Sequence, residues 1–67
     1  MIDNWKVEYL NKLYQDFPNT DTNWISNIFD NVVDSTKYEY YDKNLDLELE
    51  IYKMAKTVIT LIQIAEI

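Results

Sequence analysis

Apolar residues recur at spacings of three and four near the start of the chain, over residues 3–17. The recurring positions are Trp5, Tyr9, Leu10, Leu13, Tyr14 and Phe17. This spacing places one apolar stripe along an amphipathic helix. Pro18 ends the helix, because the residue before a proline is biased away from the helical conformation. We therefore predict a first helix over 3–17 and a loop over 19–21.

The most regular apolar pattern follows this loop. Its members are Trp24, Ile25, Ile28, Phe29, Val32 and Val33, and every residue between them is polar. Asp21 or Thr22 is suited to cap the helix that this pattern predicts. The stripe has to be buried, and the first helix offers a complementary one. The two helices are therefore expected to form a hairpin.

The stretch over 35–51 supports two interpretations. Residues 37–40 and 45–51 alternate between polar and apolar, as strands do, and 42–44 could form the turn of a β-hairpin. However, an isolated two-stranded hairpin is marginal in water, and Leu, Glu and Lys favour helices. Asn44 is also a suitable N-cap, with Asp46, Glu48 and Glu50 in the first turns, where the helix dipole favours acids.

We therefore predict a long third helix from about Asn44 to Glu66. The expected fold class is all-α, a small three-helix bundle in which a helical hairpin packs against a long C-terminal helix, in a single domain over 1–67. The alternative is an α+β fold with a short hairpin at about 36–51.

The C-terminal half of the third predicted helix is apolar on nearly every side. A helix of this kind is normally buried on every side. Two outcomes are equally compatible with the pattern: the first two helices enclose it within a monomer, or the chain self-associates as a homodimer. In the second case the oligomer interface is expected at Val58, Ile59, Leu61, Ile62 and Ala65.

The composition argues against most catalytic chemistry. The chain has no His, no Cys and no Gly, so the commonest general base, a thiolate nucleophile, Cys or His zinc sites and glycine-rich phosphate loops are missing. Asp42, Asn44 and Asp46 match the start of a calcium loop, but Leu47 and Lys53 occupy the positions where that loop needs Gly and Glu. We expect no enzyme activity, no metal and no cofactor.

Charge is concentrated in the middle third of the chain. The formal net charge is −6, and the segment 30–50 contains seven acids against Lys37 and Lys43, a local net charge of −5. Tyrosines lie between these acids, and carboxylates with aromatic rings suit a basic partner rich in Arg. The expected partner-binding residues are Asp30, Asp34, Tyr38, Glu39, Tyr40, Tyr41, Asp42, Asp46, Glu48 and Glu50.

These features predict a non-enzymatic module that binds a basic host protein and mimics the charge of DNA. Direct binding to nucleic acid is not expected from so acidic a chain. The alternative is a homo-oligomeric structural or regulatory subunit. The start of the chain lacks the positive charge and apolar core of a signal peptide, and no run is long enough to span a membrane, so we expect a cytoplasmic protein. In size, acidity and AT-rich composition, the chain resembles the small inhibitors that phages encode.

Overall fold

The computed structural model describes residues 4–37 and 45–65 as three helices. They are α1 (Asn4–Asp16), α2 (Thr22–Thr36) and α3 (Leu45–Ala65), and no strand occurs in either described range. The all-α prediction is confirmed. The part of the ambiguous stretch that follows residue 44 is helical, and residues 38–44 lie outside the described residues.

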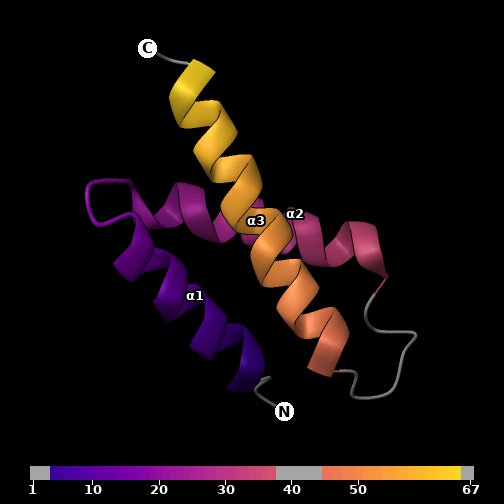
Figure 1. Ribbon diagram of the computed structural model, residues 1–67. Coiled ribbons are helices and arrows are strands. Elements are labelled where there is room, and N and C mark those ends of the chain that lie inside the picture. The colour runs from indigo at the N-terminus through magenta and orange to yellow at the C-terminus, as the bar shows by residue number, and fades with distance from the viewer. Residues whose placement is uncertain (1–3, 38–44, 66–67) are drawn as a thin grey trace.

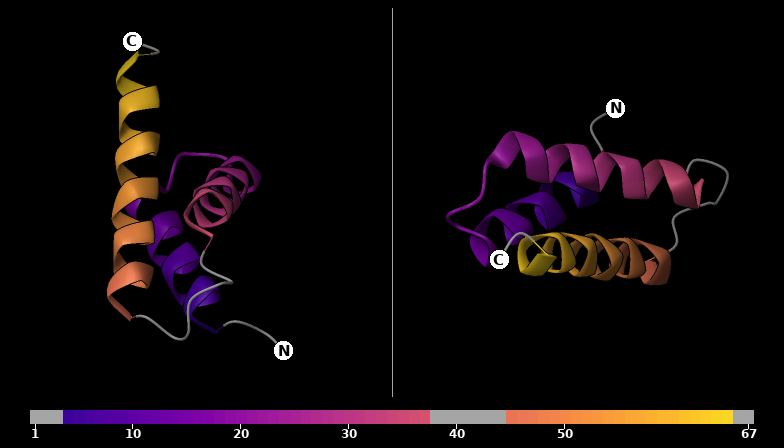
Figure 2. Two further views of the ribbon diagram at one scale, coloured as in Figure 1. Left: turned by 90° about the vertical axis from the view of Figure 1, so that its right-hand side faces the viewer. Right: turned by 90° about the horizontal axis from the view of Figure 1, so that it is seen from above.

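The hairpin of α1 and α2 packs against one side of α3, which crosses α2 at a steep angle (Figure 1). The C-terminal turns of α3 extend beyond the other two helices, as the left view of Figure 2 shows. Most of the packing in the bundle joins α2 to α3. The two helices of the hairpin therefore do not enclose α3 along its whole length.

All three helices contribute to one apolar core. Its buried members are Leu13, Ile25, Phe29, Val33, Ile51, Ala55 and Ile59. Those from α1 and α2 belong to the stripes that the sequence predicts. Trp5 and Trp24 are only partly buried and pack against this core from its edge, with the Trp5 ring centroid 6.0 Å from that of Phe29.

The two ends of α2 are fixed by local interactions. Asp21 is its N-cap, and its carboxylate accepts a hydrogen bond from the Asn23 N–H at 3.0 Å. At the other end Lys37 adopts the left-handed conformation, with φ 55° and ψ 39°, and donates its N–H to the Asp34 carbonyl. Glycine usually occupies such a position, and this chain has none.

Replacement of Lys37 by glycine is expected to stabilise the fold by about 0.5–1 kcal/mol. The left-handed conformation is strained for a residue with a Cβ atom, and this gain exceeds the entropy that glycine adds to the unfolded chain. Urea denaturation provides the free energy of unfolding. The matched control is Lys53→Gly, an exposed position inside α3, where the same change should cost about 0.5–1 kcal/mol. Destabilisation by both substitutions would contradict the expected strain at Lys37.

Candidate interaction surfaces

Two pairs of exposed carboxylates, one on α2 and one on α3, are the first candidate for an interaction site. Asp30 and Asp34 lie one turn apart on the exposed side of α2, and Asp46 and Glu50 lie one turn apart on the exposed side of α3. We call these two pairs together the acidic surface. Within the part of the chain that the structure describes, one ion pair involves these four carboxylates. It joins Glu50 Oε1 to Lys53 Nζ at 3.9 Å, and both side chains are exposed. An ion pair between two exposed side chains contributes little to the stability of the fold.

Glu48 is a correction to the predicted partner-binding set. Its relative exposure is 5%, so it lies inside the bundle and not on the acidic surface. The physical reason is its position in α3, because Glu48 precedes Ile51 by three residues and Ala55 by seven, which places all three on the core-facing side of the helix. The predicted residues Tyr38, Glu39, Tyr40, Tyr41 and Asp42 lie outside the described residues.

The predicted oligomer residues divide between two sides of α3. Val58, Leu61 and Ala65 are exposed, and Ile62 is partly buried. Ile59 is fully buried in the core beside Ala55, so its assignment to an oligomer interface was wrong. The reason is again helical geometry, because Ile51, Ala55 and Ile59 recur every four residues along the core-facing side.

A cluster of lysines and aromatic rings occupies α1 and the facing part of α3. The rings of Tyr9 and Tyr52 stack at 5.2 Å between centroids. Lys12 lies over Tyr9 at 5.1 Å, and Lys56 lies over Tyr52 at 6.0 Å, both within cation–π distance. The ammonium group of Lys56 is also 3.6 Å from the Asp16 carboxylate. Local periodicity does not reveal this cluster, since it joins residues about forty positions apart.

Tyr52 anchors this cluster through its hydroxyl group. The Oη atom donates a hydrogen bond to Oδ2 of Asp16 at 2.5 Å. This hydrogen bond, with burial of the ring and the negative charge of Asp16, raises the pKa of Tyr52 to about 12. The protonated hydroxyl joins α3 to α1 through this hydrogen bond, and the raised pKa extends the protonated form to higher pH.

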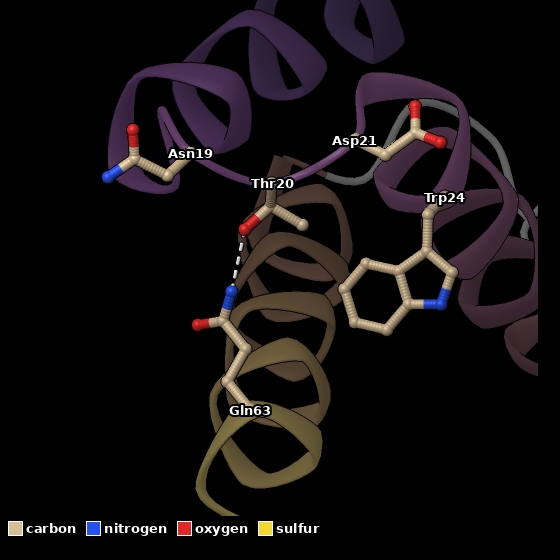
Figure 3. Close-up of a pocket in the computed structure, with 5 residues that line it drawn as sticks. All are labelled: Asn19, Thr20, Asp21, Trp24 and Gln63. Carbon is tan, nitrogen blue, oxygen red and sulfur yellow. Dashed lines mark hydrogen bonds between the residues drawn. The ribbon is translucent and has the colours of Figure 1, made fainter. Parts of the chain in front are cut away.

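An open pocket of about 450 Å³ lies where the α1–α2 loop meets the C-terminal half of α3 (Figure 3). Its lining residues are Asn19, Thr20, Asp21, Trp24 and Gln63. Gln63 donates to the Thr20 hydroxyl at 2.6 Å, which ties the loop to α3. The Asp21 carboxylate caps α2. A nucleophilic role for Thr20 would need a base at this hydroxyl, and its partner there is an amide donor.

Metal-binding and membrane-spanning features are absent from the described residues. Within residues 4–37 and 45–65, no three acidic side chains gather into a group that could hold a metal ion. None of the helices described combines the length and the apolar character that crossing a membrane requires.

Comparison of the chain with protein-family models, with curated proteins and with solved structures found no match. The geometry of the surfaces therefore carries the functional interpretation.

Proposed function

We propose that the protein is a non-enzymatic binding module whose acidic surface docks on the basic surface of a host protein in the bacterial cytosol. The counterpart that best fits these charges is a surface that otherwise binds nucleic acid. By occupying it, the module acts as an inhibitor of the kind that phages and other mobile elements encode.

The observation that carries this proposal is the pairing of exposed carboxylates at a regular spacing. Asp30 with Asp34, and Asp46 with Glu50, are each separated by four residues on one helix, which is about 6 Å along the axis. That spacing resembles the spacing of phosphates along one DNA strand. A basic groove that tracks phosphates can therefore meet carboxylates at similar intervals.

The placement of the lysines supports the same proposal. Lys12 and Lys56 lie over tyrosine rings in the α1–α3 cluster, and Lys56 pairs with Asp16. Within the described residues, no ion pair neutralises Asp30, Asp34 or Asp46. Carboxylates that no ion pair neutralises keep their attraction for a basic partner and accelerate its approach.

The test is neutralisation of three members of the acidic surface, in the variant Asp30→Asn/Asp34→Asn/Glu50→Gln. These exposed changes should leave the helical circular dichroism spectrum intact. Capture of partners from a low-GC bacterial lysate should fall by about tenfold or more, since charged pairs at an interface each contribute on the order of 1 kcal/mol. Capture by the unaltered protein should weaken as salt rises, and duplex DNA should compete with it.

The matched control removes the same number of charges elsewhere, in Asp3→Asn/Glu8→Gln/Glu66→Gln. Glu8 is exposed on α1, and the other two positions lie outside the described residues. Both variants have a formal net charge of −3, three less negative than the −6 of the chain. Equal capture by the two variants would show that net charge, and not the acidic surface, determines binding, and would overturn the proposal.

A further inference from the structure

The C-terminal half of α3 has an apolar side that the bundle leaves uncovered. Met54, Val58, Leu61, Ile64 and Ala65 are exposed. Among the described residues, Leu61 and Ile64 are the most exposed large apolar side chains, at 59% and 60%. The last turns of α3 extend beyond α1 and α2 in the left view of Figure 2. Exposed apolar area of this kind is typical of an interface.

Four of these residues form a seam with the spacing of a coiled coil. Met54, Val58, Leu61 and Ala65 are separated by four, three and four residues, which is the alternation of a and d positions in a heptad. We call these four residues the α3 seam. A seam with this spacing remains on one side of the helix and can pack against a second helix along its length.

Polar and charged groups are absent from this surface or satisfied within the helix. Residues 57–65 contain no charged side chain. The hydroxyls of Thr57 and Thr60 donate to the carbonyls of Lys53 and Lys56, at 2.9 and 2.8 Å. These two hydroxyls therefore already have hydrogen-bond partners, and a second helix can cover them without leaving a donor unsatisfied.

We propose that the α3 seam pairs with the same seam of a second copy of the chain, with the two helices antiparallel. A two-fold axis between residues 59 and 60 places Met54 of one copy opposite Ala65 of the other, and Val58 opposite Leu61. Each facing pair combines a larger side chain with a smaller one. An isologous contact of this kind requires one surface to be complementary to itself, and the spacing of the seam satisfies this condition.

The charge distribution selects the orientation of the pair. Each copy has a formal net charge of −6, so two copies approach with least repulsion where neither has a charge, which is the segment 57–65. In a parallel pair, the Glu50 residues of the two helices would lie about 10 Å apart, the usual distance between packed helices. In the antiparallel pair they are offset by about 19 residues, or about 28 Å. That distance exceeds the Debye length of about 8 Å at physiological salt.

Dimerisation through the α3 seam does not depend on the acidic surface. The effect of salt distinguishes dimerisation from capture of a basic partner. The seam is apolar and joins like-charged molecules, so dimerisation should strengthen as ionic strength rises, whereas capture through the acidic surface should weaken. Because the seam is short, the interface falls in the small size class. We expect a dissociation constant on the order of micromolar.

Sedimentation equilibrium over a range of protein concentrations tests the dimer. Leu61→Gln should raise the dissociation constant by about tenfold or more, because it places an amide at the centre of the apolar contact. Leu49→Gln is the matched control, since Leu49 is also exposed on α3 but lies off the seam, and it should leave the constant unchanged. A chain that stays monomeric at millimolar concentration, or equal effects of the two substitutions, would overturn the proposal.

Introduced cysteines test the orientation, because the chain has no cysteine of its own. Met54→Cys and Ala65→Cys are prepared as separate proteins and oxidised alone or mixed. In the antiparallel pair, identical cysteines are about 16 Å apart along the axis, far beyond the roughly 7 Å that a disulfide spans between Cα atoms. A cross-linked dimer should therefore form in the mixture only. Cross-linking of each variant alone would indicate a parallel pair and would refute the proposed orientation.

Discussion

Replacement of Phe29 by alanine is expected to leave a large fraction of the protein unfolded at 25 °C. Phe29 is fully buried in the middle of α2, within a core to which all three helices contribute. Removing a buried phenylalanine ring costs about 3–5 kcal/mol. A domain of this length has a total stability of only about 3–10 kcal/mol, at roughly 0.05–0.15 kcal/mol per residue. One substitution therefore removes a large share of the stability.

Urea denaturation followed by circular dichroism at 222 nm measures this loss. Phe29→Leu retains most of the apolar volume and should cost less than about 1.5 kcal/mol. Val7→Ala changes an exposed apolar residue of α1 and should remain within about 0.5 kcal/mol of the unaltered protein. A midpoint for Phe29→Ala close to that of Val7→Ala would mean that Phe29 does not lie at the centre of the core.

The sequence pattern determines the fold well because each helix carries its own stripe. The first helix is predicted over 3–17 and observed as Asn4–Asp16, and the third is predicted from about Asn44 to Glu66 and observed as Leu45–Ala65. Stop and start signals fix the ends of the hairpin helices on either side of their loop. Pro18 ends the first within two residues, and the Asp21 carboxylate caps the second.

The sequence is less informative about which side of α3 faces the core. Its C-terminal half is apolar on nearly every side, so periodicity alone does not separate Ile59, which is buried, from Leu61, which is exposed. Packing against α1 and α2 makes this choice. Glu48, in the first turn of α3, is a different case. Its charge groups it with Asp46 and Glu50, whereas its spacing from Ile51 and Ala55 places it on the core-facing side.

Contacts between distant residues lie beyond local patterns altogether. The stack of Tyr9 on Tyr52 and the hydrogen bond from Gln63 to Thr20 each join residues 43 positions apart. Both depend on how the hairpin is placed against α3, which no stripe specifies. The two proposed interaction surfaces are only partly predictable from the sequence for this reason. Spacing along one helix defines each pair of carboxylates and the α3 seam. Their exposure, however, depends on how the three helices pack.

Removal of the Asp16 carboxylate, in Asp16→Asn, is expected to lower the pKa of Tyr52 from about 12 towards the ordinary value of 10. The largest cause of the raised value is the hydrogen bond from the Tyr52 hydroxyl to this carboxylate, and the negative charge of Asp16 adds to it. Both disfavour the tyrosinate form. An asparagine has no charge, and so the hydroxyl should lose its proton more easily.

The pH dependence of folding follows from the same shift. Because the pKa is higher in the folded state than in the unfolded chain, the contribution of Tyr52 is fully present below pH 10 and is lost as the pH rises from 10 to about 12. Loss of the tyrosine proton also breaks the hydrogen bond that holds α1 against α3. Asp16→Asn should therefore flatten the decline in stability over this interval, relative to the unaltered protein.

Carbon-13 NMR of the tyrosine Cζ atoms resolves Tyr52 from the other five tyrosines. Tyr52→Phe assigns the resonance by removing it. Asp30→Asn is the control, because it makes the same change at an exposed carboxylate of α2, and it should leave the titration of Tyr52 unaltered. If Tyr52 titrates near 10 in the unaltered protein, its hydroxyl does not join α1 to α3 through Asp16, and the α1–α3 cluster rests on ring stacking and lysine contacts alone.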